Sequence, residues 1–393
     1  MTDTDPPIDA PRTTRRGRLQ RRLRRATRTA GRDSLVGLLV SVLLVAGVHG
    51  TGVLEGEPAD ASDLDDEAAL TAVMVGDLMF ARHVERAAEQ QGYDALLAQV
   101  RPLLQADYVT GNLEQVISDR ADELPEADKL IHLASDRRAA EALADAGFTT
   151  LALANNHLMD HGIPGLRDTV AALDEVGLAH AGAGEDLDEA SEVTYEDHGE
   201  LTVATLSFTD AYVVGFIARA FQGGVLSADP GRAARLIQEA DANADLVVTH
   251  FHWGEEYDFA PNATQRELAE MASAAGADIV VGHHPHVLQS VERIDDTLVM
   301  FSLGNFVFDQ GWTRTRESTV ARYELADDGR ARVEFVPIEV REGGPGVVSG
   351  PLAPYHRERI FQRLRGDGLE WARQDGALVT EIDHSHVVEA ATR

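Results

Sequence analysis

The clearest indication of the fold is the stretch 279–289, which reads IVVGHHPHVLQ. It opens with three β-branched residues in a row, Ile279, Val280 and Val281, and such a short apolar run predicts a β-strand. The run stops at Gly282, and three of the next four residues are histidines. In open α/β sheets, functional groups collect beyond the carboxyl ends of the strands. We therefore expect an α/β fold with a site at the edge of a sheet.

The same alternation continues on both sides of this stretch. Strands are predicted at 71–75, 151–154, 203–206, 246–248 and 279–281, and helices at 94–104, 164–176, 230–242 and 264–275. Further strands are predicted at 297–302, 319–325 and 333–340 with little helix between them, which is typical of an antiparallel extension. A charged helix is predicted at 355–375. The fold class is therefore α/β.

The composition excludes several kinds of protein. The chain has 393 residues, 44% of them hydrophobic, which is enough for one large domain with appendages. It has no cysteine, so any metal must be held by His, Asp, Glu, Asn or water, and disulfides and thiol nucleophiles are excluded. There are 66 acidic against 35 basic residues, and the resulting net charge of −31 opposes nucleic-acid binding.

The N-terminal region predicts a membrane anchor. Residues 1–33 form a basic arm with ten arginines against four aspartates, and residues 34–54 form an uncharged, mostly apolar stretch. About 20 such residues span a bilayer as a helix. An acidic linker, 55–70, follows, and this order of charges places the N-terminus in the cytoplasm and the main domain outside the cell. We therefore expect a single-pass protein of the cell membrane. The alternative is a cleaved signal peptide, and both interpretations export the main domain.

Polar residues that can bind a metal follow nearly every predicted strand. These residues are Asp77, Asn112, Glu114, Asn155, Asn156, His157, Asp160, His161, His250, His252, His283, His284, His286 and Asn305. Seven of the chain's 15 histidines are among them. Each residue alone has a simpler explanation, because such groups also form turns or satisfy loop backbone. Together they predict one polar rim at the carboxyl ends of the strands.

The donor types of this rim predict a metal centre. Pro285 favours extended geometry at His284, so we expect His284 and His286 to point to the same side of the chain. Imidazole, carboxylate and amide donors without cysteine suit Mn, Fe or Zn. Two such ions ~3.5–4 Å apart can activate a shared water. A neighbouring histidine can then serve the leaving group as a general acid. We expect a divalent centre that can be dinuclear.

Six sequence blocks resemble one known family. They are GDLMFAR (76–82), GNLE (111–114), NNHLMDHG (155–162), HWGEEY (252–257), GHHPHVLQ (282–289) and FSLGNFVFDQ (301–310). In this order they resemble the CapA family of bacterial poly-γ-glutamate capsule synthesis proteins. The resemblance implies a calcineurin-like metallophosphatase fold, a four-layer α/β/β/α sandwich, for residues 71–340. It leaves 341–393 as a C-terminal extension.

The resemblance also implies roles for single residues. The implied metal ligands are Asp77, Asn112, Glu114, Asn156, His252, His284 and His286. The implied catalytic residues are Asp77 and His157, with His157 as the proton donor. The side chains expected to support the ligands are His250, His283, Asp160 and Asn305. Two positions depart from the phosphatase pattern. Met79 stands where phosphatases have a metal-binding histidine, and Asn112 replaces the bridging aspartate unless Glu114 takes that part.

These features lead to one main hypothesis and two alternatives. The main hypothesis is an exported, membrane-anchored protein that acts in the synthesis, export or trimming of poly-γ-glutamate with a metal-dependent, hydrolase-like site. The first alternative is a non-catalytic accessory subunit of a polymer-synthase complex, which the two departures favour. The second is a general exported metallophosphoesterase. The expected partners are the membrane, an anionic polymer or phosphoester substrate, and capsule-synthase subunits, but not nucleic acid.

Overall fold

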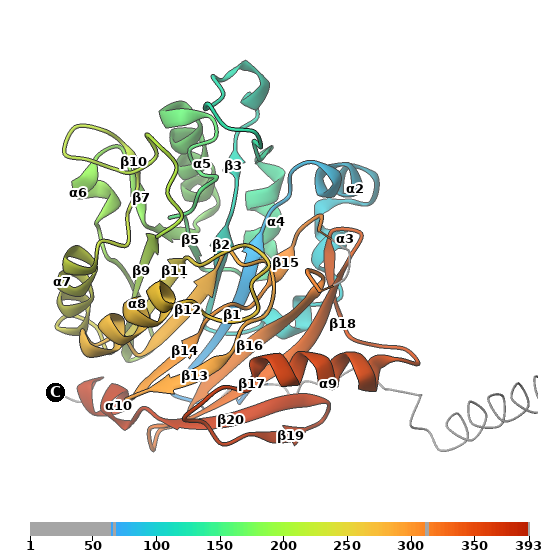
Figure 1. Ribbon diagram of the computed structural model, residues 1–393, viewed down its shortest axis with the longest axis vertical. Coiled ribbons are helices and arrows are strands. Elements are labelled where there is room, and N and C mark those ends of the chain that lie inside the picture. Colours follow the sequence, from blue (N-terminus) through green and yellow to red (C-terminus); the bar gives the residue numbers. More distant parts are fainter. Residues whose placement is uncertain (1–63, 66–67, 311–313, 392–393) are drawn as a thin grey trace, which may run out of the picture. The chain divides into compact units, whose positions relative to one another are not determined.

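The computed structural model describes residues 64–65, 68–310 and 314–391 (Figure 1). All of these residues belong to one compact unit, 57–393. The expected basic arm (1–33) and membrane helix (34–54) lie outside the described residues, together with most of the linker (55–70). Within the described part of the chain, none of the helices has the length and apolar character that a membrane span needs.

The larger of two main sheets has ten strands, eight of which lie in the order β19-β20-β17-β16-β1-β2-β5-β6. Their bounds are β1 (Leu70–Leu78), β2 (Tyr108–Leu113), β5 (Thr150–Ala152), β6 (Ala179–Ala181), β16 (Glu317–Leu325), β17 (Arg330–Arg341), β19 (Ala372–Gln374) and β20 (Ala377–Asp383). The other two strands are β15 (Asn305–Val307), which pairs with β1, and β18 (Gly344–Val347), which pairs with β17. The half from β1 to β6 is parallel. The half from β16 to β19 is antiparallel, which confirms the predicted antiparallel extension for 319–325 and 333–340. The third strand of that prediction, 297–302, instead lies in the smaller sheet and runs parallel to its neighbour 279–283.

The smaller sheet has six strands in the order β13-β14-β12-β11-β9-β8. Their bounds are β8 (Thr194–His198), β9 (Leu201–Thr209), β11 (Leu246–His252), β12 (Ile279–His283), β13 (Val291–Ile294) and β14 (Thr297–Met300). The four central strands run parallel, and the edge strands β8 and β13 are antiparallel to their neighbours. Two small pairs stand apart, β3 (Val116–Ile117) with β4 (Ala134–Ser135) and β7 (Ala183–Gly184) with β10 (Gly224–Val225).

The alternation of side chains along the strands builds separate apolar cores on the two faces of each sheet. On β1, Val73 and Val75 belong to an outer core, whereas Ala72 and Met74 belong to a core shared with the smaller sheet. The shared core continues on the facing strands of the smaller sheet, for example at Val248. Residues at alternate positions further along these strands therefore also point into the space between the sheets.

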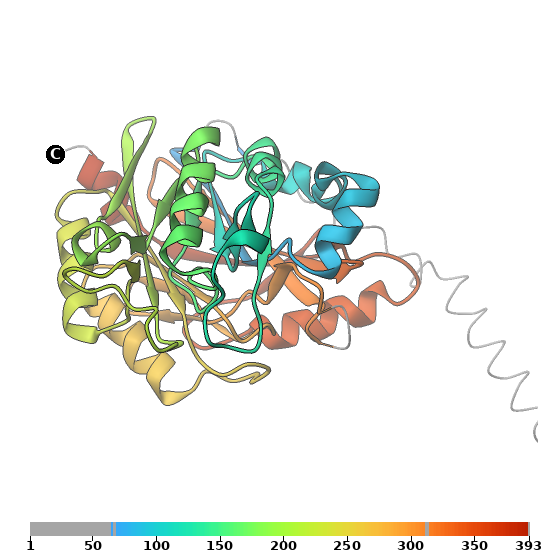
Figure 2. The same ribbon diagram turned by 90° about the horizontal axis from the view of Figure 1, so that it is seen from above.

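Helices cover the outer faces of both sheets (Figures 1 and 2). The larger sheet is covered by α2 (His83–Gln91), α3 (Tyr93–Leu97), α4 (Arg138–Ala146) and α5 (Gly162–Val176). The smaller sheet is covered by α7 (Pro230–Asp241) and α8 (Ala263–Ala274), with the short α6 (Leu187–Ala190) beside it. The helices α9 (Ala353–Leu364) and α10 (Ser385–Ala391) contribute to the core between the sheets. The described chain is therefore a four-layer α/β/β/α sandwich, as expected.

Two predicted helices differ from the structure. The helix predicted at 94–104 is divided into α3 and a 3₁₀ turn, Arg101–Leu104, because Pro102 lacks the N–H that a continuous helix needs. The helix predicted at 355–375 ends at Leu364, and Gly368 follows with a φ of +78° that a helix does not accommodate. The chain continues from there as β19.

Candidate metal centre

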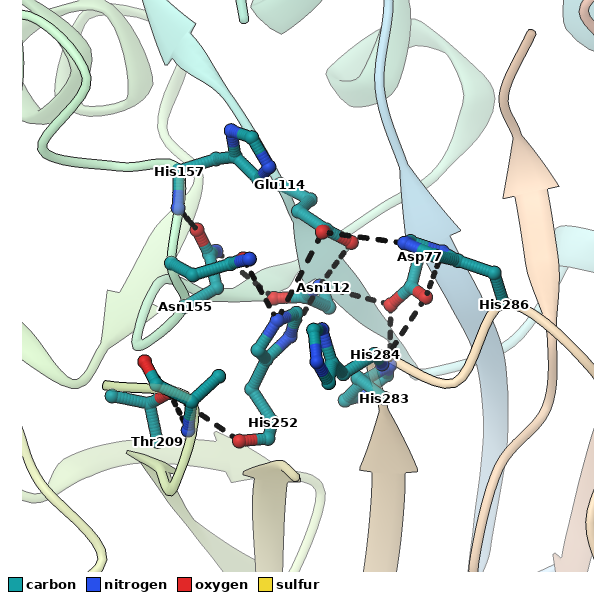
Figure 3. Close-up of polar contacts among 12 residues, drawn as sticks. Asp77, Asn112, Glu114, Asn155, His157, Thr209, His252, His283, His284 and His286 are labelled. Atoms are coloured by element: carbon teal, nitrogen blue, oxygen red, sulfur yellow. Dashed lines mark hydrogen bonds and ion pairs between the residues drawn. The ribbon is translucent and has the colours of Figure 1, made fainter. Parts of the chain in front are cut away.

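The predicted polar residues meet between the two sheets, at the carboxyl ends of β1, β2, β11 and β12 (Figure 3). Thr110 and Asn112 of β2 lie opposite His250 and His252 of β11. Thr110 Oγ1 is 3.1 Å from His250 Nε2, and Asn112 Nδ2 is 3.3 Å from His252 Nδ1. The alternation that builds the shared core therefore also aims these side chains inward. Both histidines belong to the strand itself and not to the loop that follows it.

Asp77, at the end of β1, is fully buried and surrounded by donors. Its Oδ1 accepts a hydrogen bond from Asn112 Nδ2 at 2.9 Å and lies 3.2 Å from His283 Nδ1. Its Oδ2 lies 3.3 Å from the backbone nitrogen of His284 and from His286 Nδ1. Burial opposes ionisation, but the hydrogen bonds with His283 and His286 hold the pKa of Asp77 well below its ordinary value. Both oxygens of this carboxylate already have partners.

The backbone around Pro285 differs from the extended geometry that we expected, and that prediction is wrong. His284 has a φ of 95° and His286 a φ of 55°, both in the left-handed region that non-glycine residues rarely adopt. The hydrogen bond from the His284 N–H to Asp77 accompanies this bend. The two rings still converge, because one donor atom from each of Glu114, His284 and His286 lies within 4.8 Å of the others. Such backbone strain persists where the surrounding structure enforces it, commonly at functional sites.

Glu114 follows β2 and faces the imidazoles of His252 and His286. Its Oε1 lies 3.9 Å from His252 Nε2 and 3.8 Å from His286 Nε2, and it has no hydrogen-bond partner among the described residues. Burial raises the pKa of Glu114 well above its ordinary value. Burial also opposes protonation of His286, but the carboxylates of Glu114 and Asp77 outweigh it and raise the pKa of His286 to about 9. Such a buried, unsatisfied carboxylate oxygen is costly without a proton or a cation.

Asn155, which we expected only as one of the polar residues of the rim, fixes the orientation of Asn112. Its Oδ1 accepts hydrogen bonds from the backbone N–H groups of His157 and Leu158 at 2.9 and 3.0 Å, so its amide nitrogen must point the other way. That nitrogen donates to a backbone carbonyl and, at 3.1 Å, to Asn112 Oδ1. Asn112 therefore turns its own amide nitrogen toward the carboxylates. The only signal in the sequence was that Asn155 precedes the Asn-His pair.

His157 lies beside the cluster, with its ring held by Asp160 and Lys129. His157 Nδ1 is 2.8 Å from Asp160 Oδ2 and 3.1 Å from Lys129 Nζ. Lys129 Nζ also donates to Asp160 Oδ1 and to the backbone oxygen of Asn156, both at 2.6 Å. Burial lowers the pKa of His157, so the ring is neutral at pH 7. Lys129 was not predicted as a site residue, although it is the only lysine in the chain.

Two amides orient two of the histidine rings. Asn156 Oδ1 lies 3.0 Å from His252 Nε2, and Asn305 Oδ1 lies 2.9 Å from His286 Nδ1. Burial lowers the pKa of His252 well below its ordinary value, so this ring is neutral. The bond to Asn305 leaves His286 Nε2 facing Glu114.

The remaining predicted residues lie behind or beside the cluster. His250 Nδ1 is 3.0 Å from His283 Nε2, and their rings stack, so this pair supports Asp77 from the inner side. His161 is buried near the ring of His132 and belongs to neither group of potential metal donors in the described chain. Met79 is buried in the outer core of the larger sheet.

The cluster is compatible with a divalent metal ion. Two sets of three donors lie close enough to hold one, Glu114 with His284 and His286, and Asp77 with Glu114 and His252. Within the described part of the chain, Glu114 Oε1 and His284 Nδ1 are buried without hydrogen-bond partners. Burial lowers the pKa of His284 to about 4, which keeps its imidazole neutral, as a metal ligand must be. This donor set suits Mn, Fe and Zn.

The described chain is thus an α/β sandwich with a buried cluster of carboxylates and imidazoles between its two sheets. Residues 71–310 match a family described as "Bacterial capsule synthesis protein PGA_cap". The chain belongs to this family, which confirms the resemblance seen in the six sequence blocks.

Two relatives from Bacillus support the same assignment. The chain is 41% identical over 360 residues to "Capsule biosynthesis protein CapA" of Bacillus anthracis, covering 89% of this chain and 86% of that protein. It is 43% identical over 319 residues to "PGA biosynthesis protein CapA" of Bacillus subtilis (strain 168), covering 80% of this chain and 83% of that protein.

Among solved structures, the chain is similar to the calcineurin-like phosphoesterase YfkN from Bacillus subtilis. That likeness has 12% identity and a TM-score of 0.38, and it covers 82% of this chain and 99% of that one.

Proposed function

We propose that this protein acts in the biosynthesis of a poly-γ-glutamate capsule polymer, in its synthesis, export or trimming, with a metal-dependent, hydrolase-like site. The observation that carries the proposal is the buried cluster of Asp77, Glu114, His252, His284 and His286 in a chain of the capsule synthesis family. The names of both relatives concern capsule or PGA biosynthesis, which supports the choice of polymer.

The chain's own residues can divide the work of a hydrolytic site between them. Glu114, His284 and His286 would hold a divalent ion, which acts as a Lewis acid toward the substrate when bound. Asp77 keeps the loop of His284 and His286 in place through its hydrogen bonds. His157 is neutral, and Asp160 accepts the proton on its Nδ1, so its Nε2 can take up a proton from water and then pass it to a leaving group.

Complementation of a capsule-negative strain tests this proposal. We expect the wild-type gene to restore the polymer and the double variant Asp77→Ala/His284→Ala to fail. The matched control is Asp174→Ala/His180→Ala, which removes an aspartate–histidine pair on the outer surface, where Asp174 is 66% exposed. Full complementation by the first double variant, together with no bound metal in the purified protein, would rule the proposal out.

A non-catalytic accessory role is the second candidate, and two observations favour it. Met79 is packed in an apolar core, and Asn112 presents an amide nitrogen to the cluster where the phosphatase pattern has a carboxylate. Incubation of the purified protein with poly-γ-glutamate and Mn²⁺ distinguishes the two roles. Polymer cleavage that stops on chelation supports a catalytic role, whereas capsule restoration without any cleavage supports an accessory one. Cleavage of a simple phosphodiester alone would favour a general phosphoesterase.

We also propose that residues 34–54 anchor the protein in the cell membrane, with residues 1–33 in the cytoplasm and the main domain outside. The support is the apolar stretch and the order of charges around it. We expect the full chain in the membrane fraction and its main domain open to protease added to intact protoplasts. Recovery of the full chain in the cytosolic fraction would contradict the anchor.

A further inference from the structure

We infer that this chain binds one metal ion, at Glu114, His284 and His286, and that the amide nitrogen of Asn112 takes the place of a second ion. The inference rests on the metal-dependent site proposed above and adds the number and position of the ions. It follows from the way hydrogen bonds are divided between the two sets of potential donors.

The set formed by Asp77, Glu114 and His252 is already filled by Asn112. Asn112 Nδ2 lies 2.9 Å from Asp77 Oδ1, 3.4 Å from Glu114 Oε2 and 3.3 Å from His252 Nδ1. One amide nitrogen therefore touches all three members of this set (Figure 3). The two hydrogens of this NH₂ group therefore point toward atoms that would otherwise bind an ion.

The orientation of this amide is not free to reverse. Asn155 receives two backbone N–H groups on its Oδ1, so its own nitrogen must donate to Asn112 Oδ1. Reversal of Asn112 would place two NH₂ groups against each other and remove the hydrogen bond to Asp77. The backbone at His157 and Leu158 thus determines, through two side chains, that a donor faces the carboxylates.

Asp77 and His252 also have polar contacts besides the one with Asn112. Asp77 has His283 near Oδ1, and His284 N–H and His286 near Oδ2. His252 has Asn112 at one ring nitrogen and Asn156 at the other. Each oxygen of Asp77 and each ring nitrogen of His252 therefore already has a polar partner among the residues that the structure describes.

The other set, Glu114, His284 and His286, contains atoms that no hydrogen bond from the described residues occupies. Glu114 Oε1 and His284 Nδ1 are buried and have no hydrogen-bond partner in the described chain. His286 uses Nδ1 for Asn305 and Asp77, which leaves Nε2 facing Glu114 Oε1 at 3.8 Å. When two atoms bind the same ion with bonds of about 2.0–2.2 Å each, the distance between these two atoms is similar to the 3.8 Å between His286 Nε2 and Glu114 Oε1. Asn305 behind His286 matches the hydrogen bond that orients metal-binding histidines.

Metal counting on the full-length protein tests the inference. The protein is stripped with a chelator and dialysed against Mn²⁺, and bound Mn per chain is measured by mass spectrometry. We expect one ion in the wild type and two in Asn112→Asp, which replaces the amide by a carboxylate. The matched control is Asn262→Asp at the N-cap of α8, where aspartate caps as well as asparagine, and we expect it to keep one ion.

Two further variants separate the two sets of donors. His284→Ala should lose the ion, whereas His252→Ala should keep it, because His252 is bound to two amides and not to the metal. Two ions in the wild type, one ion in a folded Asn112→Asp, or loss of the ion in a folded His252→Ala would each overturn the inference. Folding of every variant is checked by circular dichroism.

Electron paramagnetic resonance of the Mn²⁺-loaded wild type decides the question even if Asn112→Asp does not fold. The hyperfine pattern of an isolated Mn²⁺ ion supports the inference, and an exchange-coupled spectrum overturns it. A protein with one bound ion whose cluster variants still restore the capsule would refute the proposed function alone. A protein that binds no ion would refute the inference together with the metal-dependent site.

Discussion

At the scale of single residues, the protons of Glu114 and His286 govern the affinity for a metal. Burial raises the pKa of Glu114, and the neighbouring carboxylates, against the effect of burial, raise the pKa of His286 from 6.5 to about 9. Protonation of His286 therefore stabilises the metal-free fold below pH 6.5, and this contribution is lost as the pH rises through about 9. Since a ligand must be deprotonated, a metal ion has to displace these protons.

We therefore predict that the affinity for Mn²⁺ rises with pH between 6 and 9 and becomes level above that. The expected slope is about tenfold per pH unit for each proton displaced. Calorimetry in two buffers of different ionisation enthalpy measures both the affinity and the protons released. Binding that is independent of pH over this range would show that the cluster does not hold the protons that its geometry implies.

Lys129 is a second residue whose contacts lead to a prediction. Its ammonium group touches the buried carboxylate of Asp160, His157 Nδ1 and a backbone oxygen. Loss of one partner from a buried ion pair costs about 3–5 kcal/mol. We expect Lys129→Met to lower the free energy of unfolding by ~3 kcal/mol, measured by urea denaturation of the metal-free protein.

Lys129→Arg should restore less than half of this loss, because a planar guanidinium cannot direct its donors to the same three acceptors. The control is Arg120→Met, which breaks the more exposed pair with Asp168 and should cost ~1 kcal/mol or less. Equal losses for Lys129→Met and the control would show that Lys129 is an ordinary surface charge.

Much of the site could be predicted from the sequence, because parallel strands bring their carboxyl ends to one edge. Asp77, Glu114, His252 and His284 were predictable members of this edge, and their side chains do lie close together. It could not find the orientation of Asn112, which depends on distances through Asn155 to two backbone groups. It also could not foresee the positive φ values at His284 and His286, since Pro285 alone favours extended geometry.

At the scale of elements, the hairpin of β16 and β17 contains a buried ion pair between residues that face each other on the two strands. Arg322 and Glu334 are directly opposite each other, and Arg322 Nη1 lies 2.8 Å from Glu334 Oε2. Both side chains are buried, and burial lowers the pKa of Arg322. The pair therefore depends on its hydrogen bonds to offset desolvation.

We predict that Glu334→Ala lowers the free energy of unfolding by about 3–5 kcal/mol, because it removes the carboxylate that lies opposite the buried guanidinium of Arg322. The double variant Arg322→Met/Glu334→Leu should cost less than the single variant. The control in the same hairpin is Asp328→Ala, whose pair with Arg330 is exposed and worth ~1 kcal/mol or less. A single variant no less stable than the double one, measured by urea denaturation, would contradict this account.

The strands of the α/β region were predictable from apolar runs, and the helices from their period, because both patterns report burial. The ends of elements were less predictable. β11 and β12 extend to His252 and His283, since polar residues can remain in a strand when a facing sheet offers partners. The end of α9 depended on glycines that follow it, and the charged pattern beyond belongs to β19 and its turn.

At the scale of the whole described unit, the candidate metal centre joins the two sheets. Glu114 follows β2 of the larger sheet, whereas His284 and His286 follow β12 of the smaller one. A bound ion therefore links elements that are otherwise held together by the apolar core between the sheets. A ligand that binds only the folded state stabilises it by mass action.

We predict that removal of the metal lowers the melting temperature and that Mn²⁺ restores it. At a free metal concentration of 100 times Kd the gain is about 2.7 kcal/mol. Differential scanning calorimetry with and without chelator measures this difference. His284→Ala should melt at the same temperature in both conditions. A wild type that melts at one temperature with and without chelator would show that the cluster does not bind the ion.

In the proposed metal centre, carboxylate and imidazole groups from both sheets hold a metal ion between them. The most direct test is a crystal structure of the Mn²⁺-loaded protein with anomalous diffraction at the manganese edge. We predict one anomalous peak bonded to Glu114, His284 and His286, with Asn112 Nδ2 still donating to Asp77. A loaded crystal without a peak in this cluster, or with manganese bound only at surface carboxylates, would contradict the account.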